Sequence, residues 1–452
     1  MKNPAKTTFW LLVCLSGLWS LAACTQPAPP EPTATVPAIA SPSSEPTATP
    51  TVAAADTESV VAVDEWLADL AYFRERIDQL HPNPYYRVPA ATYDAKLAAL
   101  AADLPNLSET EIIVRLTEIM AFVDGHSSIH LLDDPVNFQL YPLQFYSFAD
   151  GVFLINAQAP FEEYIGGQLL RVGNRPVAAA LAALQPYIPH DNPMTIRQSE
   201  PFWLIRPEFL QTLGIIGDAD APAFLIKLAD GSQHTLNPSP ISSETYSAWL
   251  DGPATGLPLR PGTLYLQNRD QRNWSTYLAD SQTLYIQYNQ VLGSTSRLID
   301  DINQVLANET VERVVLDIRL NGGGNNNRYG DLLALVSSHP QINRPGHFFT
   351  IIGRQTFSAA TNLATELENQ TETIFVGEPT GGSPNLYGDT VVSRLPNAGI
   401  AFAVSNRYWQ FSTPDDTRVW LPPDIPVELS STDFFNDHDP ALATILAYTP
   451  SP

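Results

Sequence analysis

Three stretches of this chain combine residue types that are suited to acyl transfer. The first is "GRQTFSAATNLA" (353–364), in which Ser358 stands between an apolar run and an expected helix. A serine at the start of a helix usually caps the backbone through its side-chain oxygen. The same oxygen would also face the positive end of the helix, where the N–H of Ala359 could bind a developing oxyanion. The stretch alone leaves both roles, cap and nucleophile, open.

The second stretch is the glycine run "NGGGNNN" (321–327), which follows an apolar strand expected over 311–320. Consecutive glycines permit positive φ and leave backbone N–H groups approachable, which suits an anion or oxyanion. A merely flexible turn would have the same composition, so this alternative stays open. No lysine follows the glycines as it does in a Walker phosphate loop, and a nucleotide site is therefore not predicted.

The third stretch offers a general base, which a serine nucleophile requires. Lysine is excluded downstream, because the lysines of the chain are at positions 2, 6, 96 and 227. His126 in "DGHSS" (124–128) is the favoured candidate, since it ends an expected helix among small polar residues; the alternative is a polar turn residue. His130 is expected to be structural. The chain has no HExxH motif and no cysteine cluster, so we expect no metal and no cofactor.

The elements around Ser358 alternate regularly between strand and helix. Apolar runs predict strands at 283–289, 311–320, 347–352 and 371–378, and helical periodicity predicts helices at 294–308, 328–338 and 358–368. This pattern indicates a mixed α/β fold whose sheet is covered by helices. Ligands usually bind at the carboxyl ends of the strands in such sheets. The glycine run and Ser358 both occupy such positions, and a hairpin around "NAG" (397–399) is expected to follow.

The preceding part of the chain predicts two further units. Helices near 64–80, 93–104 and 108–123 form an N-terminal helical unit (61–135), with a capping box from Ser108 to Glu111. Short strands separated by turn residues then predict a β-rich region (136–265). Within it, "GGQLLRVGNRPVAAALAAL" has the turn, strand and helix of a PDZ-like module. The catalytic domain is expected at 266–452.

The first 60 residues predict a lipoprotein leader and a tether. Lys2 and Lys6 precede an apolar run that ends in "LAAC", which resembles a bacterial lipobox and predicts a signal peptide (1–24) with lipidation at Cys24. The Pro/Thr/Ser-rich residues 25–60 lack the composition of a folded domain and predict an extended tether. We therefore expect an extracytoplasmic protein, lipid-anchored to the bacterial cell membrane.

Composition narrows the possible partners. The formal net charge of −24 argues against nucleic acid and against docking on anionic lipid, so we expect the lipid to be the only membrane attachment. The two cysteines are Cys14 and Cys24. If cleavage occurs before Cys24, no thiol is left for a disulfide, a cysteine nucleophile or a cysteine-ligated metal.

Four motifs in this order resemble the tail-specific proteases, also called C-terminal processing peptidases, and among them the tricorn-core-like branch: "DGHSS", "VVLDIRLNGGG", "GRQTFSAAT" and "GEPTGG". The resemblance implies a crotonase-like catalytic core and serine endopeptidase activity on a protein or peptide substrate. It also implies that Ser358 is the nucleophile, that His126 is the base, and that the N–H groups of Ala359 and of Gly322 or Gly323 form the oxyanion hole.

This chain departs from the family pattern at two places. Ser383 stands where the bacterial enzymes carry the lysine of a Ser-Lys dyad, and Gly125 stands where the tricorn-like branch has a serine before its histidine. The glutamate that orients the histidine in that branch is matched best by Asp416 and next by Asp415. Two alternatives remain: a family member that binds a peptide or ligand without cleaving it, and an esterase or acyl transferase.

Overall fold

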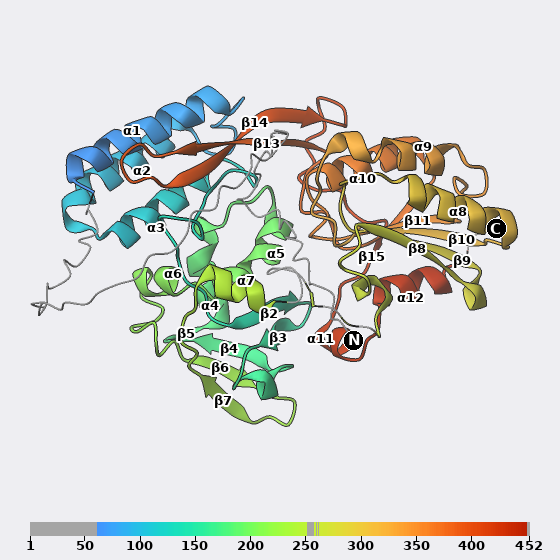
Figure 1. Ribbon diagram of the computed structural model, residues 1–452, viewed down its shortest axis with the longest axis horizontal. Coiled ribbons are helices and arrows are strands. Elements are labelled where there is room, and N and C mark those ends of the chain that lie inside the picture. Colours follow the sequence, from blue (N-terminus) through green and yellow to red (C-terminus); the bar gives the residue numbers. More distant parts are fainter. Residues whose placement is uncertain (1–60, 251–256, 259, 261, 450–452) are drawn as a thin grey trace, which may run out of the picture.

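The computed structural model describes residues 61–250, 257–258, 260 and 262–449 (Figure 1). The expected signal peptide, the tether and Cys24 lie outside these residues. None of the described helices is long and apolar enough to cross a membrane.

The N-terminal unit contains the three predicted helices: α1 (Val63–Leu80), α2 (Ala90–Asp103) and α3 (Glu109–Met120). On α1, apolar side chains recur on one face and are buried, among them Phe73 and Ile77. The predicted capping box begins α3, because the Ser108 hydroxyl accepts the N–H of Glu111 and the Glu111 carboxylate accepts the N–H of Ser108. Helix α3 ends just before the "DGHSS" turn and therefore positions His126.

A hairpin from the C-terminal third of the chain packs on this helical unit. Strands β13 (Asn385–Arg394) and β14 (Ala401–Gln410) pair antiparallel, and β14 also pairs with β1 (Ser128–Ile129). The rings of Phe73 and Phe402 lie 5.1 Å apart, and the Asp69 carboxylate accepts the N–H of Ala398 at the hairpin turn. Figure 1 shows the hairpin extending from the part of the chain that contains α9 and α10 to α1. The end of the "DGHSS" turn thus pairs with the hairpin, and the hairpin packs on α1.

The β-rich region forms an antiparallel sheet in the order β2-β3-β4-β6-β7, with β5 paired to β4. Helices α4 to α7 belong to the same region, and the apolar residues of these elements share one core with the N-terminal helices. The PDZ-like character of this region stays a prediction. The bounds of its elements are β2 (Leu143–Phe148), β3 (Gly151–Ala157), β4 (Gln168–Val172), β5 (Arg175–Pro176), α4 (Val177–Leu184), α5 (Pro193–Trp203), α6 (Pro207–Thr212), β6 (Phe224–Lys227), β7 (Gln233–Leu236) and α7 (Ser243–Trp249).

The C-terminal part of the chain is built on a six-stranded sheet in the order β15-β12-β11-β10-β9-β8. Its strands run parallel except for β8, which pairs antiparallel with β9 at one edge. The predicted alternation of strand and helix is confirmed, and so is the mixed α/β class. The bounds are β8 (Asn273–Leu278), β9 (Thr283–Tyr288), α8 (Ser296–Asn308), β10 (Arg313–Asp317), α9 (Gly330–Ser338), β11 (Phe348–Ile352), α10 (Ala359–Gln370), β12 (Ile374–Gly377), β15 (Ile425–Pro426), α11 (Ser431–Phe435) and α12 (Pro440–Ala447).

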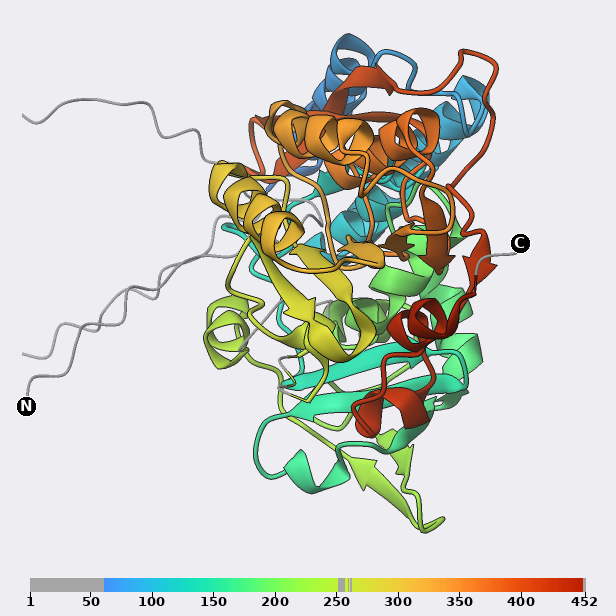
Figure 2. The same cartoon turned by 90° about the vertical axis from the view of Figure 1, so that its right-hand side faces the viewer.

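Helices cover both faces of this sheet, as the continuous apolar strands require. On β10, Val314 and Leu316 join the core under α8, α9 and α10, whereas Val315 joins the core under α12. Figures 1 and 2 show α8–α10 on one side of the sheet and the red α12 on the other. The loops that leave the carboxyl ends of β10 and β11 carry the glycine run and Ser358.

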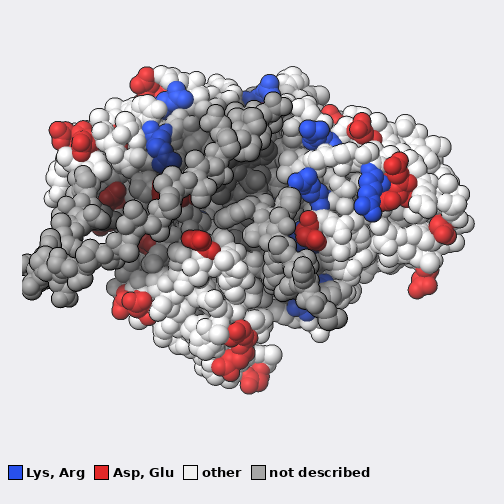
Figure 3. All heavy atoms as spheres, viewed as in Figure 1, with Lys and Arg blue, Asp and Glu red and all other residues white. Residues whose placement is uncertain are grey.

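Charged side chains do not gather into a patch of one sign on the face in Figure 3. Acidic residues lie along the outline and also within the face, and several lysines and arginines lie beside acidic ones.

Candidate active site

Ser358 lies at the turn from β11 into α10, in a backbone conformation that is rare for a residue with a side chain. Its φ is 53° and its ψ is −128°, and its side chain makes no capping hydrogen bond. Such conformations cost about 1–3 kcal/mol and cluster at functional sites. The helix-cap interpretation of Ser358 therefore fails, because the hydroxyl does not accept an N–H group of the first turn.

Hydrogen bonds from neighbouring segments hold this strained turn in place. The Thr356 hydroxyl donates to the carbonyl of Ile318 over 2.9 Å and accepts the N–H of Gly353. The N–H of Phe357 donates to the carbonyl of Asn321 over 3.1 Å. Both bonds tie the Ser358 turn to the loop after β10, so the two loops keep a defined relation to each other.

The glycine run lies directly against Ser358. A Cβ added at Gly323 would lie 2.7 Å from the Cβ of Ser358 and 2.9 Å from the nitrogen of Ala359, and Gly323 has a φ of +103°. Only glycine fits this position. The glycine run is therefore packed closely against the Ser358 turn and is not merely a flexible turn. It lies beside the N–H of Ala359 at the start of α10.

The geometry distinguishes between the two glycines that were expected to supply the oxyanion hole. The N–H of Gly323 donates to Oδ1 of Asn321 over 2.9 Å and is therefore occupied. Among the described residues, the N–H groups of Gly322 and Ala359 have no hydrogen-bond acceptor. Two unpaired donors thus remain near Ser358, which is the arrangement that an oxyanion requires.

His126 stands close to the Ser358 turn. Its imidazole stacks on the ring of Phe357, the residue before Ser358, with the ring centroids 4.4 Å apart and an angle of 23° between the planes. On the Nε2 side, β13 approaches so closely that a Cβ at Gly388 would lie 3.6 Å from Nε2. Both ring nitrogens are buried without a hydrogen-bond partner. Neither nitrogen is therefore occupied by a hydrogen bond to another described group.

The carboxylate that faces His126 belongs to Asp191, a residue that the sequence did not indicate. Its Oδ2 lies 3.9 Å from Nδ1 of His126, and its Oδ1 accepts the N–H of Gly125 over 2.8 Å. Burial, with the nearby charge of Asp124, raises the pKa of Asp191 to about 6. Raised carboxyl pKa values of this kind cluster at functional sites.

Asp191 also explains the glycine at position 125. A Cβ there would lie 2.8 Å from Oδ1 of Asp191, so a serine before His126 would collide with this carboxylate. The side chain that the tricorn-like pattern carries at this position is thus replaced by a carboxylate from another segment. Gly125 itself was the available sequence signal, although it could not indicate which residue fills the space.

A second carboxylate, Asp124, fixes the backbone of the His126 turn. Its Oδ1 accepts the N–H groups of His126 and Ser127, and its Oδ2 lies 2.8 Å from Nε2 of the fully buried His81. Burial opposes ionisation of Asp124, but the hydrogen bond from His81 and the neighbouring charges lower the pKa of this carboxyl overall. Because Nδ1 of His81 accepts the N–H of Asn83, we assign the ring proton to Nε2.

The structure places Asp416 in a different network. Its carboxylate accepts hydrogen bonds from the Ser412 hydroxyl and from the guanidinium of Arg418, and the bond from Arg418 holds the pKa of Asp416 well below its usual range. No contact among the described residues joins Asp416 to His126. Asp415 is exposed, and the hydroxyl of Ser383 donates to the carbonyl of Asn385. The expected acid therefore does not lie in the cluster formed by Ser358, His126 and Asp191.

Among the residues that the structure describes, no group of His, Cys, Asp or Glu side chains has the arrangement of a metal site. The candidate site therefore consists of hydroxyl, imidazole, carboxylate and backbone N–H groups. These groups can perform proton transfer and nucleophilic attack on a carbonyl.

The similarity of this chain to known proteins lies in its structure. No protein-family model matches the sequence, and no curated protein is similar to it in sequence. The structure is similar to that of mature CPAF complexed with lactacystin, with a TM-score of 0.60, 13% identity, and coverage of 85% of this chain and 99% of that chain. A serine-to-alanine mutant of CPAF gives a TM-score of 0.63 at 12% identity, over 86% of this chain and 99% of that one.

The photosystem II D1 C-terminal processing protease is also similar, with a TM-score of 0.38, 14% identity, and coverage of 80% of this chain and 93% of that chain. The two CPAF structures have the higher TM-scores and are covered almost completely. This chain therefore shares the fold of CPAF over 85–86% of its length.

Proposed function

We propose that this protein is a serine peptidase of the tail-specific protease type, with Ser358 as nucleophile and His126 as general base. The observation that carries the proposal is the conformation of Ser358: a strained, uncapped serine at a helix start, in contact with a glycine loop. The N–H of Gly322 in this loop and the N–H of Ala359 are both unpaired among the described residues. The fold shared with CPAF and the four sequence motifs support the same function.

In the proposed reaction, Nε2 of His126 accepts the proton of the Ser358 hydroxyl while its oxygen attacks the carbonyl carbon of a peptide bond. The N–H groups of Ala359 and Gly322 bind the oxyanion. The proton then passes from His126 to the leaving amine, and water releases the acyl group by the reverse sequence.

Asp191 takes the role of the acid that orients the base. It faces Nδ1, the ring nitrogen opposite to the one that exchanges a proton with Ser358. The 3.9 Å separation is longer than a hydrogen bond and must shorten when the imidazolium forms. Catalytic hydrogen bonds are often long without substrate and tighten in the complex.

Labelling with a fluorophosphonate probe tests this function. We expect the wild-type protein to be labelled, Ser358→Ala to be unlabelled, and His126→Ala to be labelled at least about 100-fold more slowly. Digestion of casein by the wild type then distinguishes a peptidase from an esterase. A folded wild-type protein that resists the probe would contradict the proposal.

The same result would favour the second candidate function, binding of a peptide or ligand without cleavage. One observation supports this candidate: neither ring nitrogen of His126 makes a hydrogen bond. Binding of casein to a wild-type protein that neither reacts with the probe nor cleaves casein would establish it.

We also propose that the protein is tethered outside the cytoplasmic membrane by lipid on Cys24. The support is the sequence "LAAC" after a short apolar run, followed by the proline-rich residues 25–60. Metabolic labelling with a fatty-acid analogue should mark the wild type and not Cys24→Ala. A wild type that stays unlabelled in a host that processes lipoproteins would argue against the tether.

A further inference from the structure

Strand β8 forms an open edge of the catalytic sheet. It is the last strand in the sheet order and pairs only with β9 among the described strands. The carbonyl of Arg272 accepts the N–H of Asn289, which sets the alternation of the ladder. By this alternation, the backbone groups of Asn273, Ser275 and Tyr277 are directed away from β9. The N–H groups of these three residues have no acceptor in another described segment.

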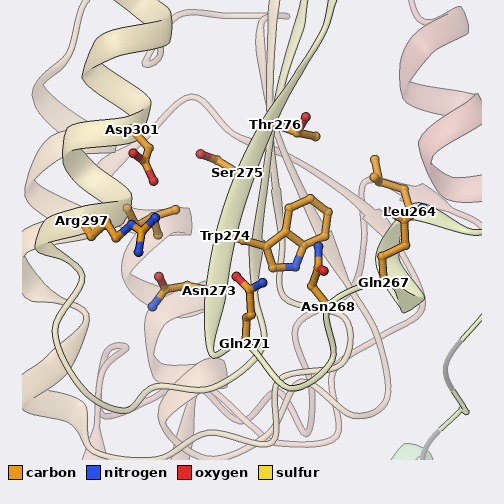
Figure 4. Close-up of a pocket in the computed structure, with 11 residues that line it drawn as sticks. Leu264, Gln267, Asn268, Gln271, Asn273, Trp274, Ser275, Thr276, Arg297 and Asp301 are labelled. Atoms are coloured by element: carbon orange, nitrogen blue, oxygen red, sulfur yellow. The ribbon is translucent and has the colours of Figure 1, made fainter. Parts of the chain in front are cut away.

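A groove of about 620 Å³ follows this edge (Figure 4). Trp274 and Thr276 point to one side of the strand, towards the segment of Leu264. Asn273 and Ser275 point to the other side, where α8 contributes Arg297 and Asp301. The open strand edge therefore lies between two walls, which is the shape that accepts one additional extended chain.

The lining of the groove suits peptide groups rather than a lipid or an anion. Carboxamide and hydroxyl groups predominate, and the single arginine is matched by a single aspartate four residues later on α8. Each carboxamide can donate and accept, as each peptide group does. The lining residues are Leu264, Gln267, Asn268, Gln271, Asn273, Trp274, Ser275, Thr276, Arg297, Leu298 and Asp301.

Strand pairing and two hydrogen bonds connect the groove to the loop beside Ser358. Asn273, at the start of β8, pairs with Tyr288 at the carboxyl end of β9. The Tyr288 carbonyl accepts the side-chain N–H of Asn321 over 2.8 Å, and Oδ1 of Asn321 accepts the N–H of Gly323. Gly323 in turn contacts Ser358. The groove thus begins at the same edge of the sheet as the candidate active site.

We propose that the β8 edge is a docking site for an extended segment of the polypeptide substrate, which adds to the sheet as a further strand. The inference rests on the proposed peptidase function and gives it a second binding surface. Three strand spacings of about 4.8 Å separate β8 from β11, a span of roughly 14 Å that four or five extended residues bridge. Substrate chains long enough to reach the groove then bind through both surfaces.

Hydrogen–deuterium exchange tests the docking on the unmodified edge. In the Ser358→Ala protein, which holds substrate without cleaving it, saturating β-casein should slow exchange of the β8 amides, including Ser275, at least about tenfold. Exchange in the antiparallel strand β7, which lies far from the groove, serves as the control. Unchanged β8 exchange under conditions where casein binds would overturn the proposal.

A matched pair of variants tests the contribution of the edge to catalysis. Ser275→Pro removes one outward N–H, whereas Ser275→Ala keeps it. We expect Ser275→Pro to lower kcat/KM for casein at least about tenfold and to leave the fluorophosphonate labelling rate at Ser358 within twofold. Ser275→Ala, which keeps the N–H and loses only one hydroxyl of the groove lining, should lower kcat/KM less than about threefold. Equal casein cleavage by the two variants would also overturn the proposal.

The outcomes separate this inference from the function on which it rests. If exchange in β8 is slowed but the wild-type protein never reacts with the probe, the proposed peptidase function is contradicted and the docking site at the β8 edge is supported. If the protein reacts with the probe and binds casein but exchange in β8 is not slowed, the peptidase function is supported and the docking site is contradicted. Protection of β8 by a chitin hexasaccharide and not by casein would overturn the inference in favour of a saccharide site.

Discussion

Asp191 lies with its Oδ2 atom 3.9 Å from Nδ1 of His126, and its other oxygen holds the N–H of Gly125, the residue directly before that histidine. One carboxylate thus contacts both the ring and the backbone of the candidate base. Asp416, the acid that the family resemblance implies, is bonded to Arg418 and Ser412. The two aspartates therefore predict different effects when each loses its charge.

We expect Asp191→Asn to lower kcat on casein by about 100-fold or more, because an amide cannot stabilise the imidazolium that forms on His126. Asp416→Asn should lower kcat less than about threefold. The kcat of casein cleavage, measured on both variants at pH 8, provides the comparison. If Asp416→Asn has the larger effect, the orienting role belongs to Asp416.

Asp191→Asn should make the folded protein more stable at pH 8, although it lowers activity. Folding raises the pKa of Asp191 from 3.8 to about 6, so the ionised carboxylate disfavours the folded state. Below about pH 4 the carboxyl is protonated in both the folded and the unfolded protein, and it does not disfavour folding. As the pH rises from there through 6, the free energy of unfolding of the wild type falls by about 3 kcal/mol relative to that of Asp191→Asn. Denaturant unfolding of both proteins at pH 4 and pH 8 measures the difference.

Asp416→Asn is the control of opposite sign. The pKa of Asp416 is lowered on folding, so its ionised form favours the folded state above about pH 4, and this contribution is lost as the pH falls below that value. At pH 8 the Asn variant should therefore be less stable than the wild type. An Asp191→Asn variant that is also less stable at pH 8 would mean that Asp191 is not a destabilising buried charge.

Gly323→Ala should abolish most activity. The added methyl would lie 2.7 Å from the Cβ of Ser358 at a φ of +103°, so the loop must move away from the nucleophile. We expect a loss of roughly 100-fold to 1,000-fold in labelling rate, as for loss of an oxyanion donor. Gly330→Ala, where no atom lies within 4 Å of the added Cβ, is the matched control. Equal rates for the two variants would exclude close contact of Gly323 with the site.

Ser358→Gly should be more stable than the wild type by about 1 kcal/mol. Glycine adopts a φ of 53° and a ψ of −128° without strain, and the Ser358 side chain makes no cap bond that would be lost. At an ordinary serine cap the same substitution costs a few tenths of a kcal/mol. The sign of the change in thermal unfolding therefore distinguishes a strained nucleophile from a helix cap.

Asp124→Ala should destabilise the fold by roughly 3–5 kcal/mol, because it leaves the buried donors of His81, His126 and Ser127 without their acceptor. Asp133→Ala, which removes a partly exposed carboxylate beside His130, should cost less than about 1 kcal/mol. Denaturant unfolding of both variants at pH 7.5 provides the measurement. Similar losses would mean that the pair of Asp124 with His81 does not support the His126 turn.

The sequence by itself determined the elements and most of the groups in the candidate site. Alternating apolar strands and amphipathic helices predicted the α/β sheet, because local periodicity reflects which face each element buries. Ser358 and the glycine run could be placed at carboxyl strand ends for the same reason. The absence of a lysine after Ser358 directed the search for a base to histidine, and His126 is the histidine that lies beside the Ser358 turn.

The tertiary structure alone decided which groups meet. Asp191 follows a helix of the β-rich region and has no motif around it, so only packing brings its carboxylate to Nδ1 of His126. The structure also distinguishes Gly322 from Gly323 as the candidate oxyanion donor, because the Asn321 side chain accepts the N–H of Gly323. Spacing along the chain specifies strands and turns, whereas contacts between distant segments arise only when their apolar faces are buried together.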